Sequence, residues 1–179
     1  EGYRSRAVYK LKEINDKFKI LRNGQSIVDL GGAPGSWSQY LSSTLKNTKL
    51  LAIDLLEIQE IKNVKLMKGD FTDDIYKKKI RSFFNTKIDL VISDMAVNTT
   101  GNKNLDAIVT GELAMESIEF AKEMLKTNGQ FVTKLFMGSS FNDIVSKSKK
   151  YFKETSVFKP PSSRKDSKET FLISKHLRP

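Results

Sequence analysis

The stretch from Ile27 to Trp37 constrains the fold of this chain more than any other. It reads IVDLGGAPGSW: an apolar run closing in an acid and a leucine, three glycines within five residues, and a segment that begins a helix. This pattern predicts a buried strand, a tight turn and a helix start. Glycine permits positive φ and a close backbone approach, and a helix start offers free N–H groups. The stretch therefore predicts a turn that holds a small polar molecule.

The pattern of an apolar run followed by an acid returns three times. These runs end at Asp54, Asp70 and Asp94. Helical segments are predicted over residues 36–45, 73–84, 107–126 and 140–151, and a polar surface loop over 95–105. Alternating strands and helices predict a parallel sheet with helices on both faces. Ligands of such sheets bind at the carboxyl ends of the strands, where Asp29 and the three later acids all fall.

The C-terminal part supplies three more strands, over residues 130–136, 154–158 and 169–174, with a basic loop over 160–168. If the strand over 154–158 runs parallel, the last strand returns antiparallel and starts at the same edge of the sheet. We predict one α/β domain over residues 1–179, built on a seven-stranded, mostly parallel sheet. Residues 1–22 contain a basic amphipathic helix that we expect to pack beside the sheet.

Composition narrows the class of protein. Lys and Arg outnumber Asp and Glu by 31 to 21, and the formal charge of +10 favours a polyanionic partner such as nucleic acid. The alternative is a lysine-rich proteome with solvated lysines. Cysteine is absent and the single histidine is His176, which argues against disulfides, a thiolate nucleophile, a Ser-His-Asp triad or a histidine-bound metal. No apolar run approaches the ~20 residues that span a membrane, and the first twelve residues carry no export signal.

The acids after the second and third strands suit an adenosyl cofactor. Asp54 stands where a carboxylate can accept hydrogen bonds from both ribose hydroxyls; it could instead cap the next segment, but the glycine turn favours the ribose. Asp70 could accept from an adenine amino group, or be a turn acid after Gly69. A nicotinamide dinucleotide fits less well, because Pro34 lacks the N–H that a pyrophosphate would need there.

Lys134 is unusual because it lies near the end of an otherwise apolar strand. Desolvation lowers the pKa of a lysine and can make it a base near neutrality, or the side chain can extend to solvent. Asp94 supports the first reading, since the two strands are expected to be neighbours. Topology adds Glu169 to the same edge. Lys10, on the N-terminal helix, can also be placed there, although its spacing does not prove it.

Six segments, in this order, resemble the FtsJ (RrmJ) family of RNA 2′-O-ribose methyltransferases: residues 3–11, 29–39, 54–56, 69–71, 93–96 and 163–169. The resemblance covers nearly the whole chain. It implies a Rossmann-like methyltransferase fold, with S-adenosylmethionine as donor and S-adenosylhomocysteine as product. The family's catalytic tetrad falls on Lys10, Asp94, Lys134 and Glu169. Its cofactor positions fall on Gly35, Trp37, Asp54, Asp70 and Asp94, to which we add Gly31 and Pro34 from the turn.

The bacterial branch of this family methylates a uridine in the A-loop of large-subunit ribosomal RNA. Related branches act in mitochondria, on tRNA or on mRNA caps. This chain has Gly32 and Ser36 where many members have alanine and glycine, and Asn98 where proline is common. The resemblance implies the uridine 2′-hydroxyl as the target, with ribosomal RNA or the large subunit as partner.

We expect Lys134 to accept the hydroxyl proton, Asp94 and Glu169 to tune its pKa, and Lys10 to orient the ribose or a phosphate. The sulfonium carries its own charge, so no metal is expected. Basic residues on two sides of this edge predict an RNA groove: Arg4, Arg6 and Lys12, then Lys159, Arg164, Lys165 and Lys168.

Two other functions compete with this one. A non-catalytic RNA-binding assembly factor could share the fold, but it would have no reason to keep a complete tetrad and the glycine turn. A small-molecule methyltransferase fits the basic composition less well. We expect a monomer without membrane contact, in the cytoplasm or in an organelle such as the mitochondrion.

Overall fold

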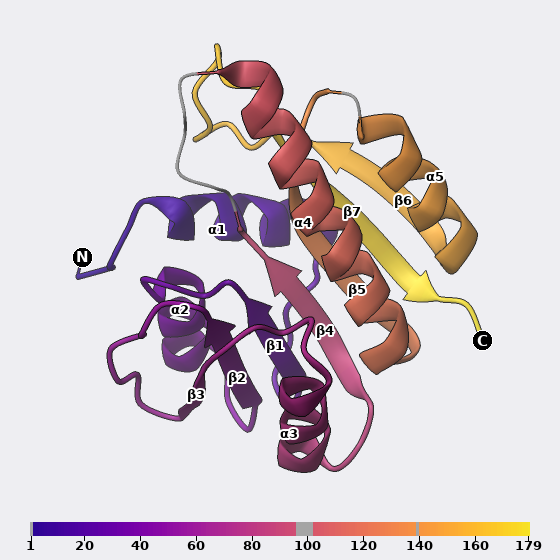
Figure 1. Cartoon of the computed structure of the whole chain (residues 1–179). Coiled ribbons are helices and arrows are strands. Elements are labelled where there is room, and N and C mark those ends of the chain that lie inside the picture. Colours follow the sequence, from indigo (N-terminus) through magenta and orange to yellow (C-terminus); the bar gives the residue numbers. More distant parts are fainter. Residues whose placement is uncertain (1, 96–101, 139) are drawn as a thin grey trace.

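The computed structural model of the chain describes residues 2–95, 102–138 and 140–179 (Figure 1). Its strands are β1 (Ser26–Leu30), β2 (Lys49–Asp54), β3 (Val64–Lys68), β4 (Ile88–Ser93), β5 (Leu125–Phe136), β6 (Phe152–Phe158) and β7 (Glu169–Leu177). Its helices are α1 (Ala7–Phe18), α2 (Ser36–Thr44), α3 (Asp74–Phe84), α4 (Lys103–Met124) and α5 (Phe141–Tyr151). Strands and helices alternate through most of the chain, as the sequence pattern predicts.

One sheet contains all seven strands, in the order β3-β2-β1-β4-β5-β7-β6. The first five pair in parallel, and β7 is antiparallel to both β5 and β6. This confirms the predicted α/β architecture with an antiparallel last strand. The carboxyl ends of β1 to β5 therefore share one edge with the start of β7, and in Figure 1 α1 runs crosswise to the strands near that edge.

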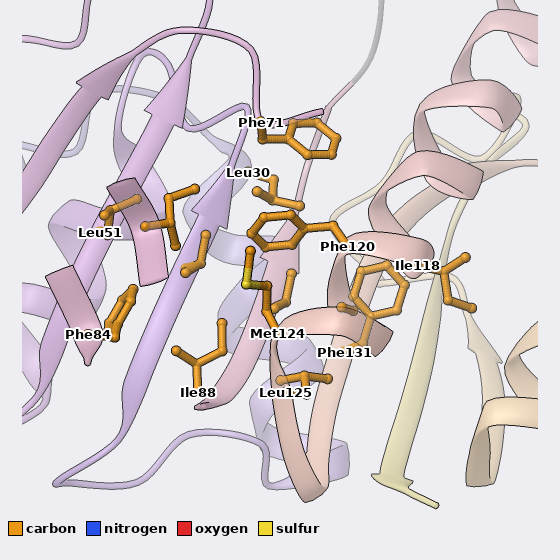
Figure 2. Packing of buried hydrophobic residues seen from close by; sticks show 14 of the residues in the cluster. Leu30, Leu51, Phe71, Phe84, Ile88, Ile118, Phe120, Met124, Leu125 and Phe131 are labelled. Carbon is orange, nitrogen blue, oxygen red and sulfur yellow. The ribbon is translucent and has the colours of Figure 1, made fainter. Parts of the chain in front are cut away.

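Alternate residues of each strand pack against different helices. On one face, α3 and α4 cover a core that contains Val91 and Phe131, and Figure 2 shows Phe120 of α4 beside Phe71 and Leu30. On the other face, α1 and α2 cover Ile92 and Val132. Because side chains alternate along a strand, Lys134 lies on the same face as Val132. The lysine therefore points to the side of the sheet that α1 covers.

The apolar period of α1 is confirmed, because Val8, Leu11 and Ile14 are fully buried. The helix begins at Ala7 and ends at Phe18, and the next residue, Lys19, has left-handed φ and ψ and donates its backbone N–H to the carbonyl of Asn15. Burial of this stripe fixes which residues of α1 face outward.

The boundaries of α4 differ from the prediction. The helix was expected over 107–126, but it starts at Lys103 and ends at Met124. Leu125 already pairs with Ile88 as the first residue of β5, so tertiary pairing ends the helix two residues early. The predicted surface loop over 95–105 is wrong for its last residues, which belong to α4, because a polar helical turn carries no apolar period to reveal it. Its central residues, 96–101, lie outside the described residues.

Across the described ranges, no helix has both the length and the apolar character needed to cross a membrane.

Candidate active site

The turn after β1 is shaped by backbone contacts that only glycine tolerates. The N–H groups of Gly31 and Gly32 both donate to the carbonyl of Ile53 at the end of β2, at 2.7 and 3.2 Å. Gly31 has φ of +66°, and a Cβ there would lie 1.9 Å from Cγ of Met95. A side chain would therefore strain the turn and collide with the residue that follows Asp94.

Asp54 joins this turn to the end of β2. One carboxylate oxygen accepts the N–H of Ala33 at 2.9 Å, and the other accepts the N–H of Leu56 at 2.8 Å. The second bond is the capping role that the sequence left open. Each carboxylate oxygen has a further lone pair, so the same side chain can still accept from ribose hydroxyls.

A cavity of about 460 Å³ opens beside the turn. Its lining includes Gly31, Asp54, Asp70 and Asp94, which places four predicted cofactor residues around one space. Asp70 is also a turn acid, because one of its oxygens accepts both the N–H and the hydroxyl of Thr72. The sequence did not predict that α4 also lines this cavity, through Leu113 and Glu116.

Glu116 is an acid that faces other acids across this cavity. Partial burial raises the pKa of Glu116, and the charges of Asp70 and Glu112 raise it further. Nothing in the sequence around Glu116 distinguishes it from other charged residues of an exposed helix face. Only the position of α4 over the strand ends reveals it.

Three predicted cofactor residues contact the N-terminal segment instead. The carbonyl of Pro34 accepts a hydrogen bond from Arg4 at 3.0 Å. Gly35 has φ of +115°, and a Cβ there would lie 2.9 Å from the Arg4 guanidinium. Trp37 is buried and donates its indole N–H to the carbonyl of Ala7 at 2.7 Å. These contacts hold the turn in place; binding of the cofactor by these residues stays a prediction.

The four residues of the predicted tetrad lie together. Nζ of Lys134 is 3.0 Å from Asp94 and 3.7 Å from Glu169. Nζ of Lys10 is 2.6 Å from the other oxygen of Glu169. Strand register explains this, because Ser93 pairs with Thr133 and Phe136 pairs with Glu169. Two ammonium groups and two carboxylates thus form one ion-pair network.

A second cavity, of about 640 Å³, lies on the other side of this network. It is lined by Arg6, Ala7, Lys10, Phe136, Ser162, Arg164, Ser167 and Glu169. The first cavity reaches the network at Asp94, and the second reaches it at Lys10 and Glu169. The side chain of Lys134 is only 10% exposed. Among the described residues, the tetrad thus borders both cavities.

Burial raises the pKa of two acids at this edge of the sheet, Asp94 and Asp29. It raises the pKa of Asp94 above the ordinary value of an aspartate, although the charge of Lys134 opposes the shift. Burial likewise raises the pKa of Asp29 to about 7, with a hydrogen bond from the Ser38 hydroxyl working against it. Asp94 and Asp54 add to the shift of Asp29. The edge of the sheet thus concentrates negative charge around the first cavity.

The basic loop over 160–168 is bound to α1 through Glu13, a residue that sequence reasoning missed. Both oxygens of Glu13 accept the N–H of Ser162, at 3.0 and 3.1 Å, and one also accepts the Ser162 hydroxyl. Lys159 donates to the carbonyls of Ser167 and Glu169 at 2.7 and 2.9 Å. The loop is therefore fixed at both ends, with Arg164 between them.

The predicted RNA-binding residues divide into two groups. Arg4 donates to the carbonyls of Pro34, Gln59 and Glu60, so it ties the chain start to two loops. Lys12 is half-buried beside tyrosine rings. The other five are exposed: Arg6, Lys159, Arg164, Lys165 and Lys168. Of these, Lys159 already donates to the carbonyls of Ser167 and Glu169.

A family model described as FtsJ-like methyltransferase matches residues 3–177. The chain belongs to the FtsJ-like methyltransferase family. Membership confirms the resemblance found in the sequence, and with it a methyltransferase whose methyl donor is S-adenosylmethionine. The two cavities that meet at the tetrad are thus those of an FtsJ-like enzyme.

Similar proteins cover nearly the same length. A Pelagibacter ubique protein named ribosomal RNA large subunit methyltransferase E is 60% identical, with 99% of this chain and 88% of the relative covered. A Rickettsia akari protein of the same name is 44% identical, with 97% and 79% covered. The crystal structure of a ribosomal RNA methyltransferase from Plasmodium falciparum matches with a TM-score of 0.86 and 30% identity, over 98% of both chains.

Replacing Asp29 with asparagine tests the buried carboxyl. Its pKa is about 7 when folded and ~3.9 when unfolded, so between these values the folded state binds more protons. Stability of the wild type should therefore fall as pH rises through this range. Asparagine does not titrate, so we expect the free energy of unfolding of Asp29→Asn, relative to wild type, to rise by roughly 2–4 kcal/mol between pH 4 and pH 8. Urea unfolding measures this difference.

The exposed Asp16 provides the control. Asp16→Asn makes the same change of charge without burial, so its difference from wild type should stay nearly constant over the same pH range. A flat difference for Asp29→Asn would contradict the raised pKa.

Replacing Glu13 with alanine should release the loop over 160–168. Hydrogen bonds to a charged group stabilise by about 1.5–3 kcal/mol, which corresponds to a roughly 10- to 100-fold larger open population. We therefore expect trypsin to cleave after Arg164, Lys165 or Lys168 faster by that factor, while far-UV circular dichroism is unchanged. Asp16→Ala, on the same helix, should cleave like wild type. Equal cleavage of the two variants would show that Glu13 does not hold the loop.

Proposed function

We propose that this FtsJ-like protein transfers the methyl group of S-adenosylmethionine to a ribose 2′-hydroxyl of large-subunit ribosomal RNA, at a uridine of the A-loop. The observation that carries the proposal is the position of the tetrad between two cavities. One cavity is lined by acids and the glycine turn, and the other by two arginines and two serines. Donor and acceptor thereby have separate spaces on the two sides of the tetrad.

The first cavity fits the donor by the chemistry of its walls. Asp54 accepts from the ribose hydroxyls, and Asp70 accepts from the adenine amino group through the oxygen that Thr72 leaves free. Gly31 leaves room for close approach because it has no Cβ. The cofactor supplies a methyl group on a positively charged sulfur. Asp94, a half-buried residue of the cavity lining, is an acid that favours a cation beside it.

The proton of the acceptor hydroxyl goes to Lys134. In the resting pair, the ammonium of Lys134 and the carboxylate of Asp94 lie 3.0 Å apart. Lys134 acts as the base after it has released one proton to solvent, with Asp94 and Glu169 holding its amine in place. The neutral amine would remove the 2′-hydroxyl proton, while the bound donor would supply the methyl group and be left as a neutral thioether. Lys134 would then be an ammonium again, paired with Asp94 and Glu169.

Lys10 and Glu169 belong to the acceptor side. Glu169 lies between the two lysines and keeps both ammonium groups in place. Lys10 lines the second cavity, where it orients the ribose or the adjoining phosphate. Arg6 and Arg164 line the same cavity and carry permanent positive charges for neighbouring phosphates. Lys165 and Lys168 extend this basic surface along the loop.

The relatives support the substrate class, since two of them are named for the large ribosomal subunit. We propose that the protein works in the cytoplasm as a monomer, with ribosomal RNA or the large subunit as partner. Residues 1–179 act as one methyltransferase domain, in which α1 and the strand ends build the site together.

Replacing Lys134 with alanine should lower methyl transfer to ribosomal RNA by at least about 100-fold, the usual contribution of a positioned base. Binding of S-adenosylmethionine should stay within about threefold of wild type, since the first cavity keeps its walls. Transfer of a labelled methyl group and calorimetric titration of the cofactor measure the two effects. Lys126 lies near the other end of β5 and is ion-paired with Asp89, so Lys126→Ala is the matched control. Activity of Lys134→Ala within tenfold of wild type would exclude this role.

The arginines of the second cavity should set the salt dependence of RNA binding. Each phosphate contact contributes about 0.7–0.9 to the slope of log K against log salt. We expect Arg6→Ala and Arg164→Ala each to reduce the magnitude of the slope by about that amount. Arg178, exposed near the far end of β7, serves as control, because Arg178→Ala makes the same change of charge. Slopes equal to wild type in both cavity variants would remove RNA phosphates from this site.

A further inference from the structure

Three tyrosine rings surround Lys12 on the side of α1 that faces away from Lys10. Nζ of Lys12 lies 5.0 Å from the ring centre of Tyr3, 5.6 Å from Tyr9 and 5.4 Å from Tyr40. Distances below about 6 Å are those of cation–π contacts. We call these four residues the tyrosine cluster. The catalytic network uses none of them.

The tyrosine cluster is fixed by bonds around it. The side chain of Gln39, next to Tyr40 on α2, donates to the carbonyl of Gly2 at 3.1 Å and accepts the N–H of Arg4 at 3.2 Å. These bonds fix the backbone on both sides of Tyr3. The rings of Tyr3 and Tyr40 meet edge to face with centres 6.3 Å apart. Because the rings are held before any ligand arrives, binding to them costs little ordering entropy.

Tyr9 is the most exposed member of the cluster, with 37% of its surface accessible. It follows Arg6, the helical N-cap residue of α1, by three positions, and residues with this spacing are neighbours on a helix surface, with Cβ atoms about 5–6 Å apart. Arg6 lines the second cavity. A strand that leaves this cavity past Arg6 therefore reaches Tyr9 next.

Charge on this part of α1 favours a polyanion. Arg6 lies on one side of Tyr9 and Lys12 on the other, at i − 3 and i + 3. The acids of the exposed face are farther along the helix, and one of them, Glu13, is bound to Ser162. A face with an exposed ring between two cations matches single-stranded nucleic acid, whose bases stack on aromatic side chains while basic groups follow its phosphates.

We propose that the tyrosine cluster binds an unpaired base of the substrate RNA close to the target nucleotide, with the base stacked on Tyr9 and a phosphate beside Arg6 or Lys12. The inference rests on the proposed RNA substrate and adds a second contact to it. It gives the enzyme a preference for a target in a loop, because a base inside a duplex cannot reach the ring.

The test uses the full chain and synthetic RNA that contains the A-loop, together with a series in which single bases flanking the target uridine are removed to leave abasic sites. Kd is measured by fluorescence anisotropy, and KM and kcat by methyl transfer. We expect Tyr9→Ala to weaken binding and raise KM about tenfold, with kcat nearly unchanged. Tyr9→Phe, which keeps the ring, should bind like wild type.

The abasic series separates stacking from a structural effect. Wild type should lose about tenfold in affinity for one abasic RNA, and Tyr9→Ala should bind that RNA and the intact RNA equally. Tyr151→Ala is the matched control, since Tyr151 has Lys122 at 4.3 Å from its ring centre on another part of the surface. It should bind RNA like wild type.

Several outcomes would overturn the proposal. An affinity of Tyr9→Ala for RNA within twofold of wild type would do so. Equal losses of affinity on every abasic RNA would do so as well, as would a Tyr9→Phe variant that binds RNA as weakly as Tyr9→Ala. A Tyr9→Ala variant that binds naked RNA normally but loses activity only on ribosomal subunits would indicate a protein partner instead of a base. If the wild-type protein methylates no RNA, the proposed function itself is refuted. No result with the Tyr9 variants can refute that function.

Discussion

A buried ammonium group is stable only beside carboxylates, and the two beside Lys134 come from other strands. Asp94 follows β4 and Glu169 begins β7, so both arrive only when β5 lies between those strands. The order of the sheet and the antiparallel direction of β7 are therefore conditions for the ion pairs. If β7 ran parallel, Glu169 would start at the opposite edge, and Lys10 would lose its partner as well.

The negative charges of the acids at this edge repel one another. Asp29, Asp54 and Asp94 lie near enough for their charges to raise the pKa of Asp29, on top of its burial. A cation in the first cavity would relieve this repulsion, and a ligand that binds only the folded state stabilises it. The repulsion therefore lowers the stability of the empty protein and favours binding of a positively charged ligand at this edge.

Topology was predictable from the sequence because most strands of the parallel sheet contain an apolar run that is followed by an acid. Register then placed Lys134 next to Asp94 without further information. Side chains that bind backbone carbonyls were not predictable. Arg4 was read as a residue for RNA, yet its partners are carbonyls of Pro34 and of residues 59 and 60, which no residue pattern reveals. Glu13 was missed because its partner is 149 residues away.

Trp37 shows how the two cavities are connected. The prediction gave it to the cofactor, but its indole donates to Ala7 of α1, and its ring packs against Phe171 of β7. The hydroxyls of Ser5 and Ser36 form a second bond between the same two segments, at 2.7 Å. Helix α2 begins at the glycine turn, whereas α1 carries Lys10 and directly follows Arg6, one of the two arginines of the second cavity. The two helices cannot move independently without breaking these bonds, so the proposed donor side and the proposed acceptor side are physically coupled.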